Sequence, residues 1–81
     1  MKIEAIWPQT WPGSAILARF DLRVTPDVLL CGLHLKRGRD GALRAYAPRI
    51  GSRIAFHMAP ETANRAAALA AAALGPVDDR G

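Results

Sequence analysis

The chain has 81 residues, the size of one domain near the lower limit for independent folding. Apolar residues make up 51% of it and charged residues 22%, which excludes a disordered polymer. Eleven lysines and arginines against seven acids give a net charge of +4, which suits an anionic partner. Because the chain has one cysteine, no bilayer-spanning apolar run and no apolar core of a signal peptide at its start, we expect a cytoplasmic protein.

Five segments have the pattern of strands. Residues 3–7 suit a short first strand, and a turn with two prolines is expected at 7–13. Residues 14–24 alternate apolar and charged side chains, which is typical of a half-buried strand. After a turn at 25–27, residues 29–36 alternate again. Their expected apolar face consists of Leu29, Cys31, Leu33 and Leu35.

Two more strands and a helix complete the prediction. Residues 42–47 and 53–58 alternate, and in the second of these Ile54, Phe56 and Met58 are expected to face the core. From Pro60 to Leu74 the chain is rich in alanine and predicts a helix. We therefore expect an α+β fold, a small antiparallel sheet of four or five strands with one C-terminal helix packed on it. The domain covers residues 1–75, and residues 76–81 form a frayed tail.

The turn lengths decide which side chains share a face of the sheet, because a slip of one residue turns a strand over. A three-residue loop at 39–41, with Gly41 left-handed, pairs His34 with Tyr46 and Lys36 with Arg44. A five-residue loop, which is also odd in length, leaves the same side chains on each face of the sheet. Only odd loops separate the leucines from the charges, so we predict one here. The turn at 25–28 needs an even loop, which places Val24 opposite Leu29.

These registers gather basic side chains on one face of the sheet. That face carries Arg19, Arg23, His34, Lys36, Arg44, Tyr46, Arg53 and His57. Basic side chains around an aromatic ring suit a nucleic acid, whereas a plain solvated face is the other interpretation. Tyr46 either stacks on a base or covers Gly32 or His34 across the strand.

The sequence contains no motif that predicts catalysis or metal binding. Cys31 and His34 have odd spacing, which places them on opposite faces of a strand, and Cys31 is expected to be a buried apolar residue. The acids are scattered, so no carboxylate pair is evident, and no glycine-rich phosphate loop lies between a strand and a helix. We expect a protein that is not an enzyme and that has no cofactor and no metal.

The order of these segments resembles the SpoVG family, the small septation and sporulation regulators of bacteria. The likeness runs from Ala15 to Leu74. It includes the strand at 16–22, the strand and glycine-containing turn at 28–38, and the segment at 41–48 that ends in proline. A strand ending in histidine at 54–57, followed by a helix, also matches. The resemblance implies a small dimer that binds DNA and RNA, with Arg65 matching a basic residue at the helix start.

The leading prediction is therefore a non-enzymatic regulator that binds nucleic acid as a homodimer. The residues expected to bind nucleic acid are Arg19, Arg23, Lys36, Arg37, Arg39, Arg44, Tyr46, Arg49, Arg53 and Arg65. The residues expected at the dimer interface are Trp7, Trp11, Leu17 and Leu30. The alternative is a protein-binding module or inhibitor encoded by a mobile element, such as a phage, that docks on another protein. No membrane contact is expected.

Overall fold

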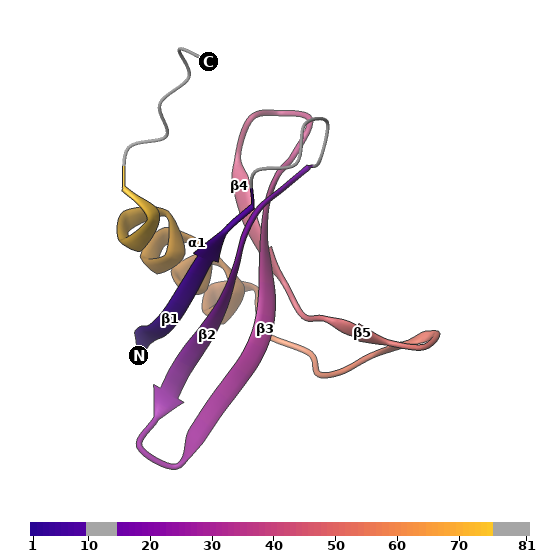
Figure 1. Ribbon diagram of the computed structural model, residues 1–81. Coiled ribbons are helices and arrows are strands. Elements are labelled where there is room, and N and C mark those ends of the chain that lie inside the picture. Colours follow the sequence, from indigo (N-terminus) through magenta and orange to yellow (C-terminus); the bar gives the residue numbers. More distant parts are fainter. Residues whose placement is uncertain (10–14, 76–81) are drawn as a thin grey trace.

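A computed structural model describes residues 1–9 and 15–75 of the chain. The fold is α+β, with a four-stranded antiparallel sheet in the order β1-β2-β3-β4, a separate two-stranded hairpin and one C-terminal helix (Figure 1). The strands and helix are β1 (Lys2–Pro8), β2 (Ile16–Thr25), β3 (Val28–Arg37), β4 (Leu43–Tyr46), β5 (Arg49–Ile50), β6 (Arg53–Ile54) and α1 (Pro60–Leu74). The expected fold class is thus confirmed, whereas most of the predicted turn at 7–13 and the predicted tail at 76–81 lie outside the described residues.

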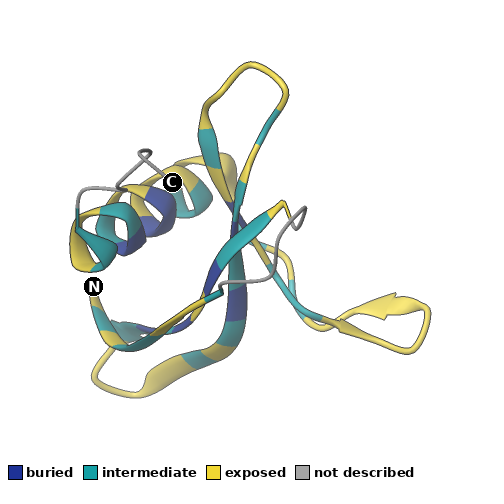
Figure 2. Cartoon of the chain, turned by 45° about the horizontal axis from the view of Figure 1, so that its top comes forward, coloured by how far each residue is buried: buried dark blue, intermediate teal, exposed yellow. Residues whose placement is uncertain are grey.

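The helix covers one face of the sheet and leaves the other face open. In both views α1 lies on one side of the four strands, and the β5–β6 hairpin projects on the other side (Figures 1 and 2). The hairpin is exposed along its whole length. We call the side of the sheet under the helix the core face and the opposite side the open face.

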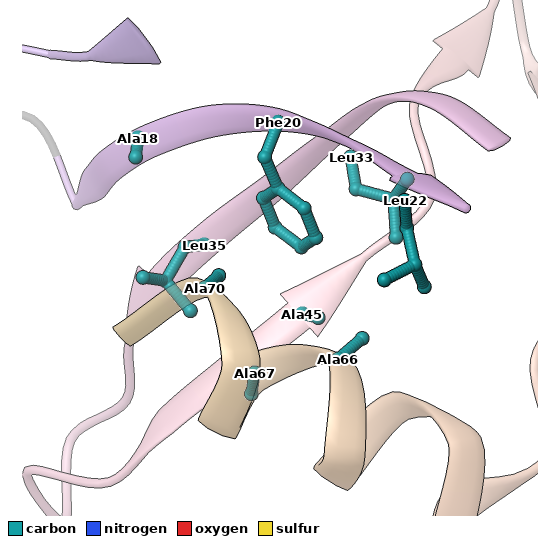
Figure 3. Packing of buried hydrophobic residues seen from close by; sticks show 9 residues of the cluster. All are labelled: Ala18, Phe20, Leu22, Leu33, Leu35, Ala45, Ala66, Ala67 and Ala70. Atoms are coloured by element: carbon teal, nitrogen blue, oxygen red, sulfur yellow. The ribbon is translucent and has the colours of Figure 1, made fainter. Parts of the chain in front are cut away.

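The core between sheet and helix is small and rich in alanine. In the described part of the chain, the fully buried large side chains are Phe20, Leu22, Leu33 and Leu35. They pack against three alanines of α1 and two of the sheet, as Figure 3 shows. These alanines are Ala18, Ala45, Ala66, Ala67 and Ala70. Because alanine has no side chain beyond Cβ, the helix backbone approaches the sheet closely.

The helix begins and ends where the sequence predicts. Pro60 occupies its first turn, where its missing N–H costs no hydrogen bond, and Glu61 complements the positive end of the helix dipole. At the other end Gly75 has a φ of 82°, and its N–H donates to the carbonyl oxygens of Ala71 and Ala72. In the described part of the chain, no helix is both long enough and apolar enough to cross a membrane.

The register of β3 and β4 is the predicted one. His34 lies opposite Tyr46, Lys36 opposite Arg44 and Leu35 opposite Ala45. The Gly38 N–H donates to the Ala42 carbonyl oxygen at 2.8 Å, which closes a three-residue loop, and Gly41 in it has a φ of 82°. The odd loop therefore separates leucines from charges, as expected.

The pairing of β2 with β3 differs from the prediction because β3 contains a bulge. Leu33 lies opposite Phe20, but Leu30 rather than Cys31 lies opposite Leu22. Gly32 has a φ of 78°, and its N–H donates to Oδ1 of Asp21 at 3.0 Å. The extra residue at this point turns the rest of the strand over.

Four expectations about β3 and its turn are therefore wrong. Leu29 and Cys31 are exposed rather than buried. Alternation places Leu30 on the face opposite Leu29 and Cys31, that is, on the charged face, but Leu30 packs against the core. Leu29 lies opposite Arg23, not Val24. Alternation gives the correct face for the residues after the bulge, from Leu33 on, but the wrong face for the residues before Gly32.

A second irregularity affects the start of β2. Ile16 lies opposite Lys36, whereas Ala18 lies opposite Leu35, so that Leu17 is an extra residue between them. Ile16 is thereby placed on the open face, not on the core face with Ala18 as its alternation predicts.

The expected fifth strand at 53–58 is replaced by the small hairpin of β5 and β6. Arg49 lies opposite Ile54, and the Ala55 N–H donates to the Pro48 carbonyl oxygen at the base of the hairpin. Ile54 is exposed, which contradicts its predicted burial. Phe56 and Met58 are partly buried against the core, as predicted, but they follow the hairpin without forming a strand.

Candidate nucleic-acid interface

One row of side chains crosses all four strands on the open face. Trp7 lies opposite Arg19, Arg19 opposite His34, and His34 opposite Tyr46. Their neighbours along the strands, such as Ile6 and Phe20, belong to the core face. Because side chains alternate along a strand, all four residues of the row point to the open face. We call them the cross-strand row.

Beside this row the open face is hollowed. The hollow has a volume of about 590 Å³, and residues of the sheet and of the β5–β6 hairpin line it. Its described lining contains basic, aromatic and apolar residues but no acid. The lining residues are Ile16, Arg19, Gly32, His34, Lys36, Tyr46, Ala47, Pro48, Arg49 and Ile54. Arg49, which is distant from Arg19 in the sequence, reaches the site because the hairpin leaves the sheet at this point.

The charges on this face affect His34. Partial burial lowers the pKa of the His34 imidazole below its ordinary value, and the positive charges of Arg19 and Lys36 lower it further. The Lys36 Nζ lies 5.2 Å from the centre of the Tyr46 ring, a cation–π distance. The site therefore combines positive charge with an aromatic surface, a combination that suits phosphates and bases.

Two of the predicted basic residues are neutralised by acids. Arg44 donates to both carboxylate oxygens of Asp40, at 3.1 and 2.8 Å. The hydrogen bond from Arg44 lowers the pKa of Asp40 to about 2, and the same pair raises the pKa of Arg44. Arg23 donates from Nε to Glu4 at 3.0 Å, which lowers the pKa of Glu4. Both pairs leave less free charge for a polyanion.

The remaining predicted basic residues do not join the hollow. Arg37 lies opposite Leu43, a residue packed against the core, so the register places it on the helix side of the sheet. Arg39 lies in the β3–β4 turn, and Arg53 lies in the projecting hairpin opposite Ile50. Arg65 is exposed on α1, in the layer that covers the core face. The structure thus brings together Arg19, Lys36, Tyr46 and Arg49 out of the predicted set.

The residues expected at a dimer interface lie in different places. Trp7 is 51% exposed and belongs to the cross-strand row. Leu17 is half-buried, and its carbonyl oxygen accepts from the Gln9 N–H. Leu30 contacts the core of its own chain, and Trp11 lies outside the described residues. The dimer itself stays a prediction.

Sequence reasoning placed several members of this site elsewhere. It assigned Trp7 to a subunit contact and Ile54 to the core, and alternation along β2 places Ile16 on the core face. It gave Gly32 only a position under the Tyr46 ring, and it gave Ala47 and Pro48 no role in a site. The places of Trp7 and Ile16 depend on irregular pairing of β1 and β2 with their neighbours, which no local pattern signals. The two prolines at Pro8 and Pro48 are visible in the sequence, but they mark strand ends without showing which faces meet.

A metal centre is not assembled in the described residues. Within 1–9 and 15–75, no group of three or more histidines, cysteines and acids lies close enough to hold an ion. Cys31 is exposed, and it precedes the bulge residue Gly32, whereas His34 belongs to the cross-strand row. The absence of catalysis, cofactor and metal stays an expectation.

The resemblance to the SpoVG family also stays a prediction. Comparison of the chain with models of known protein families, with curated proteins and with solved structures found no match.

Proposed function

We propose that this protein is a non-enzymatic regulator that binds nucleic acid through the open face of its sheet and acts as a small dimer. The observation that carries the proposal is the hollow in which Arg19, Lys36 and Arg49 surround Tyr46 and which no described acid lines. Cations bind phosphate oxygens, and the ring offers a stacking surface for a base. The resemblance to the SpoVG family supports the same function.

The arrangement of the basic side chains supports the binding of an extended anion rather than a small one. The basic side chains come from β2, β3 and the hairpin, so they are spread across the face instead of converging on one point. A polyanion contacts such a surface at several phosphates and releases a counterion at each. Binding of this kind tolerates many sequences, because phosphate contacts carry no base information.

A salt series tests the proposal. Random single-stranded and duplex oligonucleotides should be retained by the protein at low salt and released as salt rises. The double substitution Arg19→Ala with Arg49→Ala should weaken binding and reduce the slope of log affinity against log salt by about two units, one for each lost contact.

The matched control is Arg37→Ala with Arg65→Ala. It removes the same charge from the helix side of the molecule, and it should leave most of the affinity and the slope intact. Equal losses in both double variants would show that only the net charge matters. No retention of any oligonucleotide at low salt would overturn the proposal.

The alternative, a module that docks on another protein, has one observation in its favour. β1 forms an edge of the sheet, and an edge strand offers unpaired backbone groups to a partner strand. The same salt series separates the two functions, because a protein that binds only another protein would retain no oligonucleotide.

A further inference from the structure

The cross-strand row has aromatic rings at both ends and cationic or polar groups between them. Trp7 lies on the edge strand β1 and Tyr46 on the edge strand β4, with Arg19 and His34 on the two central strands. The Trp7 residue is 51% exposed and Tyr46 43% exposed, so both present ring surface to solvent. Hydrophobic burial therefore does not explain why these two rings are on this face.

The separation of the rings follows from the geometry of the sheet. Three spacings between neighbouring strands separate β1 from β4, which amounts to about 14 Å. This distance is too long for one base to touch both rings and matches a few nucleotides of an extended strand. Arg19 and His34 lie between the two rings, so the backbone of a strand that touched both rings would pass over them, and a guanidinium can donate to its phosphate oxygens.

We infer that the cross-strand row binds a single-stranded nucleic acid that crosses the sheet, with one base stacked on Trp7 and another on Tyr46. The inference rests on the proposed function and adds to it the class of nucleic acid and two specific contacts. In a duplex the bases are stacked on one another and their faces are covered, so the two rings would find no partner. An unpaired strand offers both base faces and phosphates.

Lys36 is compatible with this arrangement. Its ammonium lies 5.2 Å from the centre of the exposed Tyr46 ring, and such a contact is weak where water reaches it. A stacked base replaces the ammonium there, and the long side chain then reaches a phosphate. Arg49, across the hollow, holds the strand from the side of the hairpin.

The fluorescence of Trp7 can be used to measure the binding of an oligonucleotide. The substitution Trp11→Phe leaves Trp7 as the single tryptophan of the chain, because the sequence contains two. In this background we titrate a thymidine oligonucleotide of roughly 12 residues, the matching uridine RNA and a duplex of equal length. Trp7 fluorescence should be quenched by the single strands, and both DNA and RNA should bind more tightly than the duplex. A difference between the DNA and RNA arms shows which sugar is preferred.

Substitution of the two rings completes the test. Trp7→Ala and Tyr46→Ala should each weaken single-strand binding by about 5- to 150-fold, the range expected for one lost stacking contact. Trp7→Phe and Tyr46→Phe keep a ring and should keep most of the affinity. Because both rings are exposed, circular dichroism should show an intact fold in all four variants.

The outcomes distinguish this inference from the proposed function. Salt-dependent binding with equal affinity for duplex and single strand, no quenching and no effect of the alanine variants would overturn the inference and leave the proposed function standing. A loss at only one ring would also overturn it, because the strand would then not span the row. No binding of any probe would overturn both.

Discussion

His34 is the titratable residue at the centre of the cross-strand row. Its neighbours are Arg19 on β2, Lys36 on its own strand and the Tyr46 ring on β4, with Arg49 across the hollow. Burial and the two nearby cations lower the pKa of the imidazole, so at neutral pH the ring is uncharged and Arg19 and Lys36 carry the charge.

The position of His34 predicts a pH dependence of binding. As the pH falls through the lowered pKa, the ring gains a positive charge, and affinity for an oligonucleotide should rise. His34→Gln should flatten this rise, whereas His57→Gln, at an exposed site that does not line the hollow, should retain it. Oligonucleotide titrations between neutral and acidic pH measure both. An unchanged pH dependence in His34→Gln would contradict the assignment.

The same lowered pKa affects stability with a definite sign. The unfolded chain takes up a proton at His34 near the ordinary pKa of 6.5, and the folded protein takes it up only at lower pH. The free energy of unfolding should therefore decrease as the pH falls below 6.5, until the pH lies below the folded pKa. Binding and stability thus change in opposite directions on acidification.

At the scale of the elements, the bulge in β3 decides which leucines are in the core. Gly32 takes up a left-handed conformation that other residues adopt at a cost, and Asp21 satisfies its N–H. After this point Leu33 and Leu35 are fully buried, whereas Leu29 before it is 38% exposed. In a strictly alternating strand the three would share one face.

Two substitutions in β3 test this difference. Leu33→Ala should lower the free energy of unfolding by about 2–5 kcal/mol, because it leaves a cavity in a small core. Leu29→Ala, the matched control on the same strand, should cost under about 1 kcal/mol. Urea unfolding measures both changes. Similar losses at the two positions would indicate that β3 alternates without a bulge.

The β3–β4 turn limits the charge of the open face. Asp40 accepts both hydrogen bonds of Arg44 and also accepts from the Ala42 N–H at 3.0 Å, which orders the turn. In the substitution Asp40→Asn, the side-chain oxygen can still accept from the Ala42 N–H, but the neutral amide cannot neutralise the Arg44 guanidinium. Lys36 lies opposite Arg44, so a freed Arg44 adds to the same face.

Asp40→Asn should therefore strengthen nucleic-acid binding. The slope of log affinity against log salt should steepen by about one unit, because Arg44 gains a phosphate contact. Asp27→Asn removes the same charge from the turn between β2 and β3 and should change the slope little. Oligonucleotide titrations over a salt series compare the two, and equal effects would speak against a local role of Arg44.

At the scale of the whole molecule, the core is thin for an independent domain. Among residues 1–9 and 15–75, five of the nine buried residues are alanines, and four large side chains are fully buried. A small domain with a thin core is marginally stable, and association with a second copy is one way to add stability. The exposed edge strand β1 is compatible with such a contact.

We therefore expect a dimer whose thermal midpoint rises with protein concentration. Association stabilises the folded state by mass action, which a monomer does not show. Sedimentation velocity at micromolar concentration, together with thermal unfolding at two concentrations, measures both properties. A monomer at every concentration, with a constant midpoint, would contradict the expectation. If the open face were the interface, oligonucleotides would dissociate the dimer.

The sequence by itself determined the features that depend on local pattern. Alternation predicted strands at 14–24 and 42–47, where the structure has β2 and β4. An odd loop with Gly41 set the register of β3 and β4, and alanine content with Pro60 and Gly75 bounded the helix. Each of these signals lies within a few residues of the structure it specifies, so no distant contact was needed to interpret it.

Only the tertiary structure decided which residues meet on the open face. The N–H of Gly32 at the bulge donates to Asp21 from another strand, and the exit of the hairpin after Pro48 places Arg49 in the lining of the same hollow as Arg19. Trp7 joins the cross-strand row because β1 pairs with β2 in a register that shifts between Ile3 and Ala5. These placements depend on contacts between segments distant in the chain, and one shifted residue in a strand reverses the face of every residue beyond it.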